Sequence, residues 1–224
     1  MNDNQNSQRG FSLIELLIAM TVTIVIAGIA STLVAQSLRM RAREDARSDA
    51  IADAQRALNI VSREIANSGF GLIDNGLVPG DTGPGSIRFR ANLNAYTRDG
   101  AGNLVAGATE VLDPDEDIKY SMYNDDAANR HYLVRYDVTI GGREGTTVLA
   151  NRLDGFQLQY FDMNGTELDV VTDPDQARNT WKVRLTVGVI LPALGSPNSP
   201  GYQPESVINL VSDVVLRNSS QITF

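Results

Sequence analysis

The chain has 224 residues, of which 42% are hydrophobic and 21% charged, as expected for a folded protein rather than a disordered one. Its 27 acidic and 19 basic side chains give a formal net charge of -8, which argues against a nucleic-acid-binding protein with a basic patch or stripe. The absence of cysteine excludes disulfides, thiolate metal sites and cysteine nucleophiles, and the single histidine, His131, excludes a two-histidine metal site within one chain.

A single long helix is predicted for residues 11–68. All eight prolines lie at or after Pro79, and Gly28 is the only glycine between Gly10 and Gly69. Because proline and glycine break or weaken helix interiors, these 58 residues can form one helix of about 87 Å. A compact domain of this size needs no helix so long, so part of it must be buried in something else.

The first half of this helix, residues 11–38, is apolar and carries one charged side chain, Glu15. Residues 16–35 are 20 uncharged, mostly apolar residues, about the length that crosses a bilayer core. A buried core helix rarely stays apolar on every face over five turns. We therefore expect a membrane-inserted segment here.

The second half, residues 39–68, is predicted to be amphipathic. Apolar side chains recur at alternating steps of three and four and form one stripe, which we expect to pack against a globular body. They are Ile51, Ala54, Leu58, Val61 and Ile65. Charged residues, among them Asp53 and Glu64, lie off the stripe and are expected to face water or neighbouring molecules. Gly69 is the expected C-cap.

The ten residues before the helix, MNDNQNSQRG, are polar and end in Arg9 and Gly10. A conventional secretory signal has a shorter apolar run followed by a small-residue cleavage site, and this chain has neither. Glu15 lies five residues into the apolar run, where an ionisable group is costly and by default indicates a functional site. The alternative, which the sequence leaves open, is that Glu15 sits near the membrane edge and reaches water.

The segment RGFSLIE at residues 9–15, followed by the apolar run, resembles the class III signal of type IV pilins and type II secretion pseudopilins. In that family a membrane-embedded prepilin peptidase cuts after the glycine and methylates the new terminal amine. The resemblance implies that Gly10 ends the leader, that Phe11 becomes the methylated N-terminus and that Glu15 serves assembly. In a stack of subunits Glu15 can approach the amine of the next subunit, so that the two charges compensate each other and fix the axial register.

Later segments resemble PilW-type minor pilins and the related J-type minor pseudopilins. They are AQRAL at 54–58, SREI at 62–65, SGFG at 68–71, LDGFQLQY at 153–160, VRLT at 183–186 and VLRN at 215–218. Major pilins commonly have a helix-bending proline where this chain has Thr32, and many close a C-terminal loop with a disulfide, which is impossible here. The resemblance implies a minor pilin that helps to initiate or cap a type IV pilus, with a J-type minor pseudopilin of a type II secretion system as the alternative.

The body, residues 69–224, is predicted to be mainly β. Period-two alternation indicates strands at 132–140, 156–160 and 181–187, with a further strand at 207–216, and Asn164-Gly165 indicates a hairpin-type turn. In the first of these strands Tyr132, Val134 and Tyr136 are expected to face inward. The expected fold class is α+β and pilin-like, with the long helix packed on an antiparallel β-sheet body.

No enzyme signature, cofactor or metal site is predicted. Residues 113–117 begin like a calcium loop, but Ile118 and Asn124 stand where such a loop needs glycine and glutamate, so a solvated acidic turn is favoured. His131 has no nearby nucleophile in the sequence, which favours a structural or surface histidine. Residues 141–145 lack the lysine of a phosphate loop and indicate a glycine-rich turn between strands.

The resemblance implies a topology that charge alone does not favour. Arg39, Arg41 and Arg43 follow the apolar run directly, and by the positive-inside rule they favour a cytoplasmic body. We give the specific processing motif more weight. We expect a cytoplasmic, cleaved leader at 1–10, a transmembrane and filament-core helix at 11–38, its amphipathic continuation at 39–68 and a periplasmic or extracellular body at 69–224.

The expected location is therefore the inner membrane first and the pilus or cell surface later. The expected partners are other pilins, which contact the N-terminal helix, the prepilin peptidase, the inner membrane and the pilus assembly machinery. A third alternative, from another class of protein, is an envelope binding protein held by an uncleaved membrane anchor.

Overall fold

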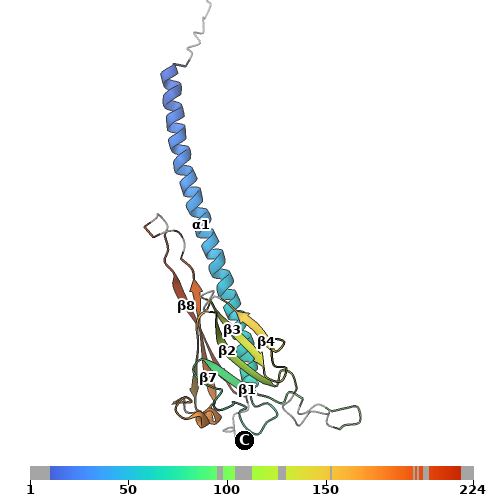
Figure 1. Cartoon of the computed structure of the whole chain (residues 1–224). Helices are drawn as coiled ribbons and strands as arrows, with labels where there is room; N and C mark the ends of the chain where they lie inside the picture. Colours follow the sequence, from blue (N-terminus) through green and yellow to red (C-terminus); the bar gives the residue numbers. More distant parts are fainter. Residues whose placement is uncertain are drawn as a thin grey trace, which may run out of the picture.

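The computed structural model describes residues 11–94, 98–103, 113–125, 130–151, 153–193, 195, 197–198 and 202–217. The predicted leader, with Gly10, lies outside these residues, as does position 218. The fold is α+β and pilin-like, as predicted: one long helix packs with its C-terminal half on antiparallel sheets, and its N-terminal half projects away from them (Figure 1).

The predicted uninterrupted helix is confirmed as α1 (Leu13–Ala66), 54 residues long. The expectation that Gly69 caps this helix is wrong. The cap is Asn67, whose backbone N–H donates to the carbonyl of Glu64 at 3.0 Å. Gly69 lies in the following turn at φ +76°, and its N–H donates to the carbonyl of Arg90 at 2.8 Å.

The body contains two four-stranded antiparallel sheets rather than one. The first has the order β1-β2-β3-β4, with β1 (Ser86–Arg90), β2 (Asp117–Asp125), β3 (Arg130–Asp137) and β4 (Thr146–Ala150). The second has the order β6-β5-β7-β8, with β5 (Leu153–Phe161), β6 (Glu167–Leu168), β7 (Lys182–Leu191) and β8 (Ser206–Val215). A 3-10 helix, η1 (Pro174–Asn179), precedes β7.

The four predicted strands correspond to β3, β5, β7 and β8, and β1, β2, β4 and β6 were not predicted. The turn at Asn164-Gly165 is confirmed, with Gly165 at φ +82° between β5 and β6. The predicted strand 132–140 is too long at its end. β3 stops at Asp137 because the Asp137 carboxylate accepts hydrogen bonds from the backbone N–H groups of Thr139 and Ile140 and so closes a turn.

The inward face predicted for β3 is also wrong. Leu133 and Asp137 are fully buried, whereas Tyr132, Val134 and Tyr136 are only half-buried. The polar side chains of the inner face have internal partners, so their burial is compensated. In β5 and β7 the predicted inward residues Phe156, Leu158, Tyr160, Val183, Leu185 and Val187 are all buried.

The core lies between the C-terminal half of α1 and the two sheets. The helix contacts β7 and β8 of the second sheet and β4 of the first. Its buried side chains belong to the same hydrophobic cluster as four fully buried residues of the body, Ile87 and Leu133 from the first sheet, Leu185 from the second sheet and Leu216 just after β8. This packing fixes one half of α1 to the body and leaves the other half uncovered.

Candidate functional site

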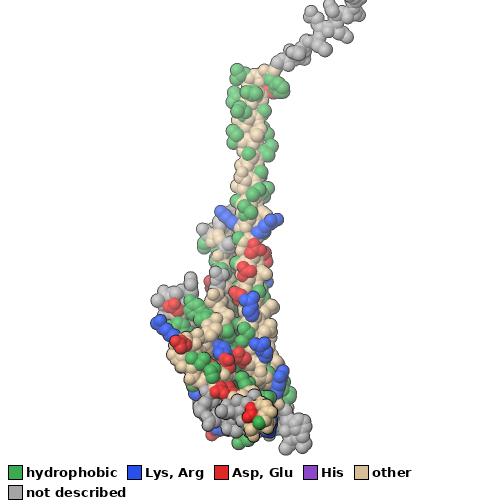
Figure 2. Space-filling view, turned by 90° about the vertical axis from the view of Figure 1, so that its right-hand side faces the viewer, with side chains coloured by type: hydrophobic (Ala, Val, Ile, Leu, Met, Phe, Trp, Pro, Cys, Tyr) green, Lys and Arg blue, Asp and Glu red, His purple; other side chains and the backbone are tan. Residues whose placement is uncertain are grey.

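The N-terminal half of α1 is an uncovered apolar rod. Every residue from Phe11 to Ala42 is exposed in the chain, and Phe11 itself is 82% exposed. Figure 2 shows hydrophobic side chains on this stretch up to the point where basic ones begin. Within the described part of the chain, α1 is the one helix long and apolar enough to cross a membrane, and its most apolar window has a mean hydropathy of 2.5 with 0% buried.

Four hydroxyl side chains in this rod are satisfied by the helix itself. Thr21, Thr23, Ser31 and Thr32 each donate to a carbonyl three or four residues earlier, at 2.7 to 2.8 Å. A hydroxyl bonded in this way needs no partner from the surroundings, so it can enter an apolar environment at small cost. Glu15, which is exposed in the first turn of α1, remains the one ionisable side chain between residues 11 and 38.

A band of charge follows the rod. Basic side chains come first, at Arg39, Arg41 and Arg43, and acidic ones start at Glu44 and Asp45 (Figure 2). None of the described side chains from residue 39 to 49 makes an ion pair within the chain. Their charges are thus presented to the surroundings.

The residues of the predicted apolar stripe lie at the contact between α1 and the body. Ala54, Leu58, Val61 and Ile65 are buried, and Ile51 is half-buried at the edge of the contact. Ala57, which the sequence analysis did not include, is 1% exposed. The sequence pattern that could have identified Ala57 as buried is its spacing, three residues after Ala54 and four before Val61. The stripe therefore holds the body on the helix.

Glu64 is the functional contact that sequence reasoning missed, because it was placed among the solvent-facing charges. Its Oε2 accepts hydrogen bonds from Tyr120 Oη at 2.7 Å and from Arg135 Nε at 3.0 Å. Burial, reinforced by the Glu64 charge, raises the pKa of Tyr120, which stays a neutral donor. Burial alone would lower the pKa of Arg135, but its bonds to Glu64 and Asp115 outweigh burial and raise it.

The acidic segment at 113–117 does not form a calcium loop in this structure, because its carboxylates have separate partners. Asp113 accepts from Asn94 Nδ2 at 2.6 Å, and Asp115 pairs with Arg135 at 2.5 Å. Glu116 is 2% exposed and accepts the backbone N–H of Leu93 at 2.7 Å. Among the described residues, no three His, Cys, Asp or Glu side chains are arranged to hold a metal ion.

Asp117 is the centre of a cluster of charges on β1 and β2. Arg88 binds both of its oxygens, at 2.8 and 2.9 Å, and Arg90 Nε binds one at 2.9 Å. Burial raises the pKa of Asp117, but the two arginines outweigh burial and hold it below its ordinary range. Lys119 and Arg88 also bind Asp81 and lower the pKa of that carboxyl. The cluster joins the first two strands.

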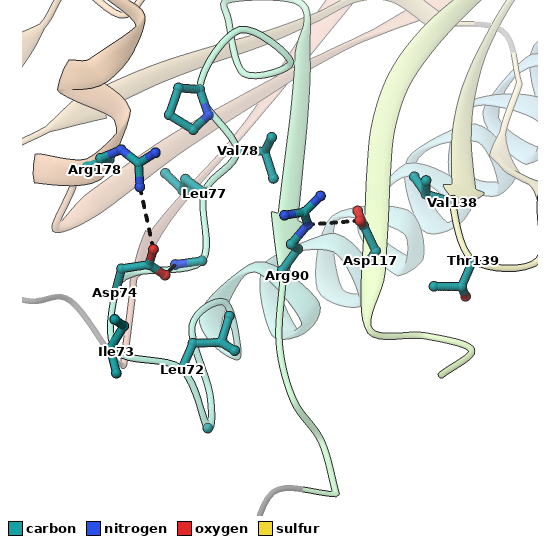
Figure 3. Close-up of a pocket in the computed structure, with 13 residues that line it drawn as sticks. Leu72, Ile73, Asp74, Leu77, Val78, Arg90, Asp117, Val138, Thr139 and Arg178 are labelled. Carbon is teal, nitrogen blue, oxygen red and sulfur yellow. Dashed lines mark hydrogen bonds and ion pairs between the residues drawn. The ribbon is translucent and has the colours of Figure 1, made fainter. Parts of the chain in front are cut away.

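An open cavity of about 860 Å³ lies beside this cluster, near the C-terminal end of α1 (Figure 3). Its apolar lining includes Leu72, Val78 and Val138. Its charged residues are paired, Arg90 with Asp117 at 2.9 Å and Arg178 with Asp74 at 3.6 Å. The described lining contains no histidine, serine or lysine, and its two carboxylates are the ones held in these ion pairs.

His131 and the glycine-rich segment have structural surroundings. His131 lies on β3, with Nδ1 2.9 Å from Oδ1 of Asn124 on β2. Residues 141–145 form the turn between β3 and β4, as predicted, where the N–H of Gly141 donates to the carbonyl of Asp137 at 3.0 Å. Neither region adds a reactive group to the cavity.

Comparison with known proteins agrees with the N-terminal features. No curated protein matches the chain significantly. Residues 5–34 match the family described as the prokaryotic N-terminal methylation motif. This match covers the end of the polar leader, the Gly10-Phe11 junction, Glu15 and most of the exposed rod. Proteins with this signal are structural, pilin-like proteins rather than enzymes. The chain thus carries the N-terminal signal of a type IV pilin-like, membrane-anchored protein.

Proposed function

We propose that this chain is a minor pilin of a type IV pilus, which helps to initiate the filament or forms part of its tip complex. The observation that carries the proposal is the continuity of the methylation motif at 5–34 with a helix whose apolar half is exposed throughout in the described part of the chain. Prepilin peptidase cuts between Gly10 and Phe11 and methylates Phe11, and the exposed rod then joins those of other pilins.

Glu15 gives the assembled rods their register. Apolar surface alone does not draw helices out of a membrane, because lipid tails are as apolar as the side chains they cover. A carboxylate in the first turn and a cationic terminal amine are each costly in such surroundings, and they compensate each other when one subunit is stacked on the next. The Glu15 carboxylate and the terminal amine of the neighbouring subunit can meet at one axial offset only, so this ion pair specifies how subunits are staggered.

The proposed topology has the leader at 1–10 in the cytoplasm, the helix at 11–38 in the inner membrane and the body at 69–224 in the periplasm, later at the cell surface. The charge band supports a role in assembly. Arg39 and Arg41 are exposed and lie on one side of a border with exposed Glu44 and Asp45 on the other. Axially shifted copies of such a helix can bring unlike charges together.

Mass spectrometry of the purified mature protein tests the proposal. It should show loss of residues 1–10 and one added methyl group on Phe11. Gly10→Trp should leave the leader in place. Gly28→Ala is the matched control, since a Cβ at Gly28 meets no atom within 4 Å and processing should continue. An intact Met1 in the parent chain contradicts the proposal and favours the uncleaved anchor.

Gene deletion separates the pilus from the pseudopilus. A minor pilin predicts loss of surface fibres while secreted enzymes still leave the cell. The opposite result, normal fibres with enzymes retained in the periplasm, would assign the chain to a type II secretion pseudopilus. Restoration of fibres by the parent gene, and not by Gly10→Trp, ties the phenotype to the processed subunit.

A further inference from the structure

The apolar rod defines where the membrane surface crosses the chain. Residues 16–38 are 23 residues, about 34 Å of helix at 1.5 Å per residue. The hydrocarbon core of a bilayer is about 30 Å thick. A rod that fills this core therefore ends close to Leu38, and the exposed Arg39 and Arg41 lie at the level of the lipid phosphates. Figure 2 shows basic side chains at this border.

The connection between β7 and β8 reaches almost the same level. Arg43 lies four residues beyond Arg39, which is about 6 Å along the helix axis. Its guanidinium donates to the side-chain oxygen of Gln203 and, through Nη2 at 3.3 Å, to the backbone carbonyl of Pro204. In Figure 1 the described ends of β7 and β8 and the residues next to them extend past the other strands, toward the apolar half of α1.

The described tip of this connection has the chemistry of a membrane interface. Tyr202 is 36% exposed. Tyrosine favours the boundary between headgroups and hydrocarbon because its ring is apolar and its hydroxyl forms hydrogen bonds with water and headgroups. Pro204 is exposed beside it. On α1 the acidic side chains begin with Glu44, after Arg39, Arg41 and Arg43, so the basic side chains of the helix are nearest the bilayer.

We propose that a membrane-facing foot, defined as Arg39, Arg41, Arg43, Tyr202, Gln203 and Pro204, rests on the phospholipid headgroups of the membrane that holds α1. Arg39 and Arg41 bind lipid phosphates, Arg43 clamps the tip to the helix, and Tyr202 enters the interface. The inference rests on the membrane insertion contained in the proposed function and is independent of the choice between pilus and pseudopilus.

The foot gives the body a second attachment. A body held by one helix can turn about that helix, whereas a body held at two points has a fixed orientation. The foot lies near the start of β8, and the cavity beside Arg90 and Asp117 lies at the other end of the sheets, near the C-terminal end of α1. The cavity end therefore points away from the bilayer while the subunit waits for assembly.

The absence of cysteine allows a direct test with spin labels on the full-length chain. Single cysteines replace Tyr202 or Pro204 in the foot, Ile26 in the rod and Ile73 at the cavity end, which is 102% exposed. Each variant is labelled with a nitroxide and reconstituted into vesicles of phosphatidylglycerol and phosphatidylcholine. Electron paramagnetic resonance then measures collisions of the label with oxygen, which enters the bilayer, and with a nickel chelate, which stays in water.

The expected result is a graded one. The Ile26→Cys label should meet oxygen, the Ile73→Cys label should meet the nickel chelate, and both foot labels should collide with the chelate at least about twofold less often than the Ile73→Cys label. Arg39→Gln with Arg41→Gln should restore these collisions, because each basic side chain contributes about fivefold to affinity for an anionic surface. Arg56→Gln, on the same helix but distant from the bilayer, should have no effect.

Three results would overturn the inference. If the Ile26→Cys label is buried while the foot labels are as accessible as the Ile73→Cys label, the chain is anchored and the foot does not touch lipid. If the Ile26→Cys label is in water, α1 is not inserted, and the proposed function fails with the inference. If protection of the foot rises with the ratio of protein to lipid, the foot contacts another copy of the chain instead.

Discussion

Glu64 of α1 and Arg135 of β3 form an ion pair, with Oε2 and Nε 3.0 Å apart, at the contact between the helix and the first sheet. The same oxygen accepts the hydroxyl of Tyr120, and the Arg135 side chain is 14% exposed. Apolar packing holds α1 on the second sheet, and this pair adds a directional contact to the first sheet. We infer that Glu64 fixes where along the helix the body sits.

Glu64→Gln should therefore destabilise the body by about 2–3 kcal/mol, because Arg135 and Tyr120 would lose the charge that they both contact. Urea unfolding of the full-length protein in detergent, followed by circular dichroism of the β signal, measures the change. Asp53→Asn is the matched control, since Asp53 is on the same helix and its pair with Arg56 is exposed and 3.8 Å long. Its effect should stay below about 0.5 kcal/mol. If the two substitutions lowered the free energy of unfolding equally, the inferred role of Glu64 would be contradicted.

The cluster around Asp117 should make the body sensitive to acid. The pKa of Asp117 is lowered in the folded chain, and the pKa of Asp81 is lowered too, chiefly because of Lys119. A carboxyl with a lowered folded pKa stabilises the fold above its unfolded pKa of about 3.9, and this contribution is lost as the pH falls through the folded value. The urea midpoint should be steady near neutral pH and fall steeply below about pH 4.

Asp117→Asn identifies the source of this pH dependence. The variant should be less stable at neutral pH, because Arg88 and Arg90 lose their shared partner, and its stability should change less between neutral pH and pH 3 than that of the parent. The comparison is made from urea midpoints at both pH values. A variant with the same acid-induced drop as the parent would show that other carboxyls cause the sensitivity.

Gly76 should be intolerant of any side chain. It adopts φ +74°, and a Cβ there would lie 2.2 Å from the carbonyl oxygen of Arg90 and 2.3 Å from the nitrogen of Gly69. Gly80 adopts φ +82° but has no atom within 4 Å of such a Cβ, so it isolates the cost of the backbone conformation. Gly80→Ala should cost about 1–2 kcal/mol, and Gly76→Ala clearly more or prevent folding. Similar unfolding midpoints for the two would contradict the close approach of Arg90.

The helix and the strands of the second sheet could be predicted because their signals are local. The absence of proline and glycine between residues 29 and 68 permits α1, and alternation in β5 and β7 follows the buried face directly. The prediction of the buried face of β3 failed because that face carries Arg135 and Asp137, and hydrophobic periodicity assigns charged residues to the solvent-exposed face. Arg135 is compensated by Glu64, 71 residues away in sequence, and by the Asp115 carboxylate, whereas Asp137 accepts the backbone N–H groups of Asp115 and Thr139.

The strand β1 of the first sheet was missed for a related reason. β1 has five residues, of which only Ile87 and Phe89 are apolar, and its arginines bind Asp117 across the strand pair. A strand stabilised by ion pairs between neighbours has little hydrophobic signal of its own. The rod, in contrast, could be predicted as a site because an apolar face without cover in the chain already implies a partner.

Glu15→Gln should prevent efficient incorporation of the subunit into fibres while leaving processing and membrane insertion intact. The amide keeps the size of the side chain but removes the charge that, in the proposed function, compensates the terminal amine of a neighbour, so we expect axial register to be lost. Fibres sheared from cells and probed for the subunit measure incorporation, and mass spectrometry of the membrane fraction measures processing. Glu44→Gln removes an exposed charge beyond the rod and should reduce incorporation much less. Normal incorporation of Glu15→Gln would show that register comes from packing of the rods alone.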